Sequence, residues 1–183
     1  MKIQDNFLPE EVYDQLIDYC IENDFQIVRR GDKEFSVMQI PSYFKAFLQI
    51  EDHELILSFI RSAKIDFDND LRIHADNIIE GKKTALASVL YINPEGTVSP
   101  NGTAFWKHHI HGLELPEDVS NEEFDRLLTE DSNDLSKWEH VETVYAKPNR
   151  QLVYNSNHFH SKYPKVIEEG TRIVLVCFYA KKQ

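Results

Sequence analysis

About eight short runs of strand-forming residues follow one another along the last two-thirds of the chain and constrain the fold most strongly. Each run is bounded by turn residues, and no helical crossovers of the kind that join parallel strands are evident between them. Such a pattern predicts a β-sandwich or an open barrel. The runs cover residues 64–67, 71–75, 84–92, 103–110, 140–146, 151–155, 158–161 and 171–180.

The first third of the chain is predicted to be largely helical. Pro9, followed by Glu10 and Glu11, is typical of a helix start, and a stripe of apolar residues with helical spacing follows to about Asn23. Apolar residues between 41 and 62 also recur near helical spacing, which predicts one or two helices with a break near residues 51–52. Residues 26–28 and 35–38 are predicted as short strands, and residues 120–130 as a helix within an acidic insert, with a capping-box spacing at its start.

Composition limits the binding partners and the cellular compartment that can be expected for this protein. The formal charge of −11 argues against non-specific binding to nucleic acid or to an anionic membrane surface. No apolar run approaches the ~20 residues of a membrane-spanning helix, and the N-terminus lacks the apolar core of a signal peptide. Cys20 and Cys177 both lie in hydrophobic settings and are predicted to be buried thiols. We therefore expect a cytoplasmic protein.

His74 and Asp76 are the first candidates for chemistry. They lie two residues apart, so on an extended strand both side chains point to the same face. An imidazole and a carboxylate on one face are two of the three ligands that hold non-haem Fe(II) and leave open coordination positions. The same spacing arises by chance in surface loops, so the prediction depends on what else the chain supplies.

His160 and Arg172 complete the pattern. His160 lies in a later predicted strand and would supply the third ligand. Arg172 alternates with Val174, Val176 and Phe178, and a lone arginine on an apolar face needs an anionic partner because an unpaired buried charge is costly. Its planar guanidinium suits a carboxylate. A structural salt bridge to an acidic residue is the alternative.

Over nearly its whole length, this sequence resembles the 2-oxoglutarate- and Fe(II)-dependent dioxygenases, in particular the prolyl 4-hydroxylase-like branch. Residues 74–76 look like the family's proximal iron motif, and His160 with Pro164 looks like its distal motif. Residues 90–93 resemble the family's "YLN" strand, and 101–105 its "GGxxF" strand, with Asn101 in place of the first glycine. Arg172 lies where the family places its co-substrate arginine.

The resemblance implies a mainly β fold, a double-stranded β-helix (jelly roll, cupin-like) with N-terminal support helices. We expect a single domain over residues 1–183, with a helical support region at 1–63 and a jelly-roll core at 64–183 that contains the acidic insert at about 113–136. It also implies iron held by His74, Asp76 and His160, and 2-oxoglutarate held by Arg172 and hydrogen-bonded by Tyr91. An ordinary packing role for Tyr91 stays open.

The activity implied is hydroxylation of an unactivated C–H bond, in a protein or peptide residue or in a small molecule, with release of succinate and CO2. Fe(II), 2-oxoglutarate and O2 are the expected cofactor and co-substrates, and ascorbate is a further candidate. Two alternatives remain: a non-oxygenase cupin-type metal-binding enzyme, and a non-catalytic jelly-roll domain with a binding or structural role.

Other histidines compete for these roles. His158 lies two residues before His160 and would share its face, but the spacing to Pro164 favours His160 as the ligand. Among His108, His109 and His111, a rim or substrate-contacting role for one of them is favoured over a second metal site. Trp106 and Trp138 are expected in the core or in a pocket wall.

Overall fold

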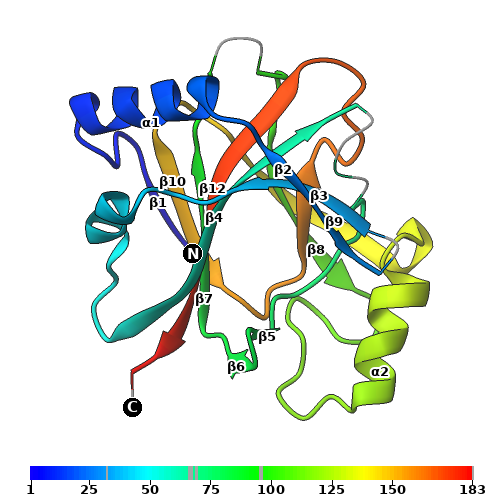
Figure 1. The fold of residues 1–183 in the computed structure, drawn as a ribbon. Coiled ribbons are helices and arrows are strands. Elements are labelled where there is room, and N and C mark those ends of the chain that lie inside the picture. Colours follow the sequence, from blue (N-terminus) through cyan, green and yellow to red (C-terminus); the bar gives the residue numbers. More distant parts are fainter. Residues whose placement is uncertain (32, 66–67, 69, 95–96, 183) are drawn as a thin grey trace.

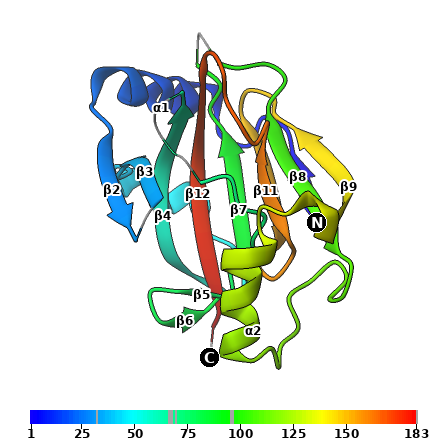
Figure 2. The same cartoon turned by 90° about the vertical axis from the view of Figure 1, so that its right-hand side faces the viewer.

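The architecture consists of two antiparallel sheets that face one another (Figures 1 and 2). The computed structural model describes residues 1–31, 33–65, 68, 70–94 and 97–182. The larger sheet has the strand order β1-β10-β7-β12-β4-β3-β2, and the smaller one β11-β8-β9. The large-sheet strands are β1 (Lys2–Gln4), β2 (Gln26–Arg30), β3 (Lys33–Met38), β4 (His53–Lys64), β7 (Leu86–Tyr91), β10 (Arg150–Asn155) and β12 (Thr171–Lys181). The small-sheet strands are β8 (Gly102–His108), β9 (Trp138–Tyr145) and β11 (His160–Tyr163).

Most predicted strands are confirmed, with exceptions at residues 64–67 and 71–75. Residues 71–75 do not form a regular strand, and within this run only His74 is in a β-bridge, to His160. The Asp70 side chain accepts a hydrogen bond from the backbone N–H of Arg72 (3.2 Å), a local bond of the kind that competes with strand ladders. Of the predicted strand at 64–67, Lys64 ends β4, and residues 66 and 67 lie outside the described part.

The helices predicted between residues 41 and 62 are largely wrong. Only a 3-10 helix, η1 (Ser42–Leu48), forms there, and β4 occupies the rest, paired along its length with β12. Both faces of β4 are covered: Ile60 packs on one side, whereas Leu57 and Phe59 pack between the sheets. A strand buried on both faces carries apolar residues at successive positions, and this pattern was mistaken for helical spacing.

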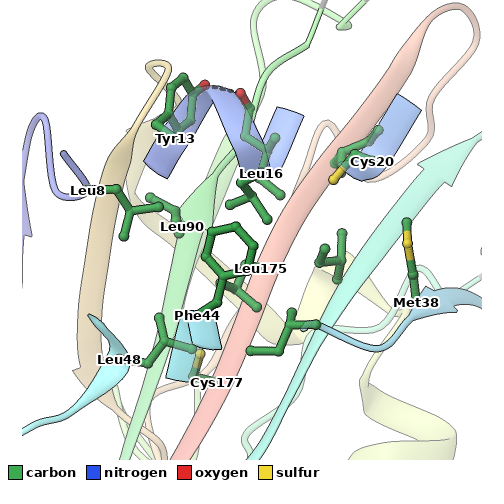
Figure 3. Packing of buried hydrophobic residues seen from close by; sticks show 14 of the residues in the cluster. Leu8, Tyr13, Leu16, Cys20, Met38, Phe44, Leu48, Leu90, Leu175 and Cys177 are labelled. Carbon is green, nitrogen blue, oxygen red and sulfur yellow. Dashed lines mark hydrogen bonds between the residues drawn. The ribbon is translucent and has the colours of Figure 1, made fainter. Parts of the chain in front are cut away.

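Helix α1 (Glu10–Glu22) covers the outer face of the large sheet (Figure 1). Its buried residues include Leu16 and Cys20, which belong to the same cluster as Leu90 and Leu175 of the sheet (Figure 3). The Tyr13 hydroxyl donates a hydrogen bond to the backbone oxygen of Ile92, which ties the helix to the end of β7. Both cysteines are buried free thiols, as predicted. None of the helices in the described ranges is long and apolar enough to cross a bilayer.

The acidic insert packs as a separate unit against the small-sheet side (Figure 2). Helix α2 (Asn121–Arg126) continues as a π-helical turn, η2 (Leu127–Asp131), and a 3-10 turn, η3 (Leu135–Lys137), follows. Ser120 Oγ accepts a hydrogen bond from the backbone N–H of Glu123 (3.2 Å), which confirms the predicted cap. Leu115 and Leu127 share a buried cluster with Ile73 and Ala75, so the insert covers the back of the segment that carries His74 and Asp76. A short hairpin of β5 (Ile78–Ile79) and β6 (Lys82–Lys83) follows that segment.

Candidate metal and co-substrate site

A single β-bridge brings the two distant histidines together. His74 N donates to His160 O (3.0 Å), and His160 N donates to His74 O (2.9 Å). Their imidazole rings lie 4.5 Å apart. The backbone N–H of Asp76 donates to Ser156 O (2.7 Å). His74 and Asp76 are therefore both held by backbone hydrogen bonds to the chain in and just before β11. The sequence separation of the three candidate ligands is thus bridged by backbone hydrogen bonds.

Each histidine ring is oriented by the nitrogen that points away from the shared space. His74 Nδ1 lies 3.1 Å from Arg72 O, and His160 Nδ1 lies 2.9 Å from His158 O. A carbonyl oxygen only accepts, so each Nδ1 carries the hydrogen and each Nε2 keeps its lone pair. This is the usual arrangement behind metal-binding histidines, whose second nitrogen is fixed by a carbonyl or a carboxylate.

The three inward-facing donor groups are spaced as the ligands of one ion would be. Asp76 Oδ1 lies 3.7 Å from His74 Nε2, and Asp76 Oδ2 lies 3.3 Å from His160 Nε2. One donor atom from each residue can be chosen so that all three lie within 4.8 Å of one another. Donors at right angles, each about 2.1 Å from a metal, stand about 3 Å apart. The set therefore fits a divalent first-row metal.

The protonation states also suit a metal. Burial and the neighbouring His160 lower the pKa of His74, which keeps its imidazole neutral. Burial acts to raise the pKa of Asp76, but the adjacent His160 and His74 outweigh it and the pKa lies below its ordinary value. Metal ligands must be neutral imidazoles and ionised carboxylates, so little proton release opposes binding near neutral pH.

Arg172 lies in the interior with its charge incompletely satisfied. Its Nη2 donates to Gly102 O (3.1 Å), whereas its buried Nε has no hydrogen-bond partner among the described residues. No salt bridge joins Arg172 to an acidic residue in the described ranges, which removes the structural alternative considered for it. Burial lowers the pKa of this guanidinium. A buried guanidinium with an open donor is a binding group for an anion.

Tyr91 and Gly102 shape the surroundings of Arg172. The Arg172 guanidinium carbon lies 6.0 Å from the centre of the Tyr91 ring, and the Tyr91 hydroxyl donates to Thr103 Oγ1 (2.8 Å). A side chain at Gly102 would collide with the backbone of Val144 on β9, so only glycine fits at the position whose carbonyl oxygen accepts from Arg172. Tyr91 thus lies near Arg172, but its hydroxyl is already bonded to Thr103, and its role toward a co-substrate stays a prediction.

Sequence reasoning missed a buried ionic network next to this space. Arg61 forms a two-point salt bridge with Asp68, one arm of which is Nη2–Oδ1 at 2.6 Å. Lys162 Nζ lies 3.5 Å from Asp68 Oδ1 and donates to Asp70 O, and burial lowers the pKa of Lys162 to about 8. Lys162 lies two residues after His160 and so shares its face, a spacing from which it could have been found.

Removing the Asp68 charge is expected to destabilise the fold. In Asp68→Asn, the buried guanidinium of Arg61 keeps its charge but loses the carboxylate that balances it. Breaking a buried ion pair from one side lowers the free energy of unfolding by about 3 kcal/mol or more. Urea unfolding followed by circular dichroism measures the change. The double variant Arg61→Met/Asp68→Asn should recover part of the loss, and equal midpoints for Asp68→Asn and the parent chain would contradict the prediction.

Three further histidines, His108, His111 and His158, contact acids of the insert. His158 Nε2 lies 2.5 Å from Glu114 Oε1, and His111 Nε2 lies 2.6 Å from Glu123 Oε1. His108 is fully buried, with Nε2 at 3.3 Å from Asp131 Oδ2, and belongs to the contact between β8 and the insert. Within the described ranges, only His74, Asp76 and His160 form a metal-compatible group, so the three histidines of 108–111 provide no second one.

An open groove of about 1290 Å³ adjoins the chain just after Asp76, although His74, Asp76 and His160 are not among its lining residues. Its wall includes Asn77, directly after Asp76, and Asn157, three residues before His160. The β5–β6 hairpin, the ends of β4 and β12, and residues 114–117 of the insert complete it. The groove thus reaches the 74–76 segment through Asn77 and through Ser156, whose backbone oxygen accepts from Asp76 N, and the insert contributes Glu114 and Glu117 to its wall.

Comparison with known protein families assigns the chain to one of them. The family described as "Family of unknown function (DUF6445)" matches residues 35–168, a range that includes His74, Asp76 and His160. The chain belongs to this family. The match ends before Arg172, so the arginine of this DUF6445 protein lies outside the matched range. No protein with a curated description matches the sequence.

Solved structures similar to this DUF6445 protein are 2-oxoglutarate-dependent oxygenases. A prolyl-4-hydroxylase from Pseudomonas putida is 16% identical with a TM-score of 0.53, over 100% of this chain and 92% of that one. The alpha-ketoglutarate-dependent carbocyclase SnoK of nogalamycin biosynthesis is 11% identical with a TM-score of 0.66, over 97% and 78%. HygX from Streptomyces hygroscopicus, solved with nickel, 2-oxoglutarate and hygromycin B, is 11% identical with a TM-score of 0.61, over 98% and 82%. At these identities the likeness establishes the double-stranded β-helix fold.

Proposed function

We propose that this DUF6445 protein is an Fe(II)- and 2-oxoglutarate-dependent oxygenase. The observation that carries the proposal is the pairing of two features in one β-helix. One is a His74–Asp76–His160 group with metal-ligand spacing, and the other is a buried Arg172 with an open donor. A metal site alone fits many cupin-type enzymes, whereas the buried cation accounts for the second carboxylate of a dicarboxylic co-substrate.

Iron bound at this site would supply oxygen activation coupled to decarboxylation of 2-oxoglutarate, with release of succinate and CO2. The protein's own residues contribute position and charge. His74, Asp76 and His160 would hold the ion through two imidazole nitrogens and one carboxylate. Arg172, with Tyr91 beside it, neutralises the far carboxylate in an interior where an unpaired anion would be costly.

The proposed reaction is hydroxylation of an unactivated C–H bond, and the groove is the proposed substrate site. Amide and hydroxyl groups of Asn77, Thr84, Asn155 and Ser156 line it, which favours a polar substrate such as a peptide segment or a hydrophilic small molecule. The similar structure of HygX, solved with hygromycin B, is one case in which this fold holds a polar small molecule.

Anaerobic titration of the metal-free protein with Fe(II) and 2-oxoglutarate tests the proposal. A weak visible charge-transfer band that needs both components is expected, because it reports a keto acid chelated to iron. Tight metal binding without the band would favour a cupin-type enzyme of another kind. Absence of metal binding would instead favour a non-catalytic jelly-roll domain.

A further inference from the structure

Tyr154 on β10 is a buried aromatic residue to which the proposed function assigns no role. It is 3% exposed, and its ring lies 4.9 Å from the His160 ring at a steep angle. Phe105 packs edge-on against the same tyrosine at 5.2 Å. Its neighbour across the ladder on β7 is Ala87, whose small side chain leaves room for the ring. Packing from two sides therefore fixes the ring beside a candidate metal ligand.

The hydroxyl of Tyr154 lies among the charged groups of the interior. It interacts electrostatically with Asp76 on the metal side, and with Tyr91, Arg172 and Arg61 on the co-substrate side. These groups come from three different strands and from the 74–76 segment, so Tyr154 is within electrostatic range of both the candidate metal ligands and the candidate carboxylate-binding arginine. Burial raises its pKa well above the ordinary value, so it remains a protonated donor.

Unlike three other buried tyrosines, Tyr154 has no hydrogen-bond partner for its hydroxyl among the described residues. Tyr91 donates to Thr103 Oγ1, Tyr13 to Ile92 O, and Tyr179 to Leu48 O. Across the described ranges, no hydrogen bond from Tyr154 is found, and its interactions are ring contacts and electrostatic ones. Its oxygen is also not one of the sealed, unpartnered polar atoms of the described part, so the hydroxyl of this buried ring opens to accessible space and is free to donate to a ligand.

We propose that the Tyr154 hydroxyl donates a hydrogen bond to the keto-acid end of metal-bound 2-oxoglutarate, and so acts as a further catalytic residue. The inference rests on the proposed function. It assigns the two ends of the co-substrate to different strands of the large sheet: the far carboxylate to Arg172 on β12 and the chelating end to Tyr154 on β10. A phenylalanine in this position would preserve the packing but lose the donor.

Comparison of Tyr154→Phe with Tyr179→Phe tests this assignment without measuring turnover. Each change removes one hydroxyl from an enclosed tyrosine, but Tyr179 lies in the cluster under α1, away from the site. The measurements are the dissociation constant of 2-oxoglutarate in the anaerobic Fe(II) protein, the wavelength of the charge-transfer band and the thermal midpoint.

Tyr154→Phe should weaken 2-oxoglutarate binding about 10- to 100-fold, as expected for a lost hydrogen bond to a charged group. It should also move the band to shorter wavelength, because a hydrogen bond to the keto acid lowers the energy of its acceptor orbital, and leave the thermal midpoint unchanged. Tyr179→Phe should show the reverse, a lower midpoint with unchanged binding and band. If the parent protein shows the band and Tyr154→Phe matches it in affinity and wavelength, the role of Tyr154 is overturned while the proposed function stands. A parent protein without the band overturns both.

Discussion

Asp76→Ala is expected to abolish 2-oxoglutarate-dependent turnover and to weaken divalent metal binding by at least about 100-fold. Changes in groups that merely support metal ligands already cost about 10- to 100-fold in affinity, and Asp76 is the only anionic donor of the candidate set. The fold should persist, because Asp76 lies in a short connection that is anchored through its backbone to Ser156. Removing a partly exposed carboxylate between two imidazoles should not expose core surface.

Metal affinity of Asp76→Ala is best measured by competition with a chromophoric chelator, alongside circular dichroism to verify folding. Asp125→Ala is a suitable control, since Asp125 is an exposed acid on α2 and leaves the site untouched. A folded Asp76→Ala protein with parental metal affinity and turnover would remove the basis for the assignment.

Arg172→Leu is expected to weaken 2-oxoglutarate binding by about 100-fold or more and to leave metal binding within a few-fold of the parent protein. Truncating one partner of a buried, hydrogen-bonded charge pair costs about 2–5 kcal/mol, and each 1.4 kcal/mol is a factor of ten. The metal ligands belong to other segments, so their geometry does not depend on the guanidinium. The free protein should also gain some stability, because burial of the unpaired charge of Arg172 is unfavourable in the absence of an anion.

Isothermal titration of 2-oxoglutarate into the anaerobic Fe(II) protein measures the effect of Arg172→Leu. Arg172→Lys is the informative companion: it retains the charge but loses the planar two-point geometry, and should fall between the parent and Arg172→Leu. Equal weakening of metal and co-substrate binding in Arg172→Leu would indicate a general disturbance of the interior. Unchanged co-substrate affinity would exclude the arginine from the site.

The sequence determined the order and type of most strands and the residues for the candidate site. Alternation along 171–180 predicted β12, with Arg172 facing the same interior as Val174 and Phe178. Val174 and Phe178 do lie together in the hydrophobic cluster between the two sheets. Such periodicity is local information, because it follows from the strand geometry itself. The His74–Asp76 spacing was informative for the same reason, although this segment forms a bridge rather than a strand.

Tertiary structure alone decided what depends on contacts between distant segments. The β4 segment looked helical because two different cores bury its two faces, and neither core is visible from residues 53–64 alone. The Arg61–Asp68 pair and the role of the Tyr154 hydroxyl could likewise not be predicted from the sequence. The role of a charged group or a hydrogen-bond donor depends on the groups that surround it in the folded protein. Spacing along a chain fixes which side chains share a face. Burial, and therefore the value of each charge or hydrogen bond, is set by the packing of segments that are far apart in sequence.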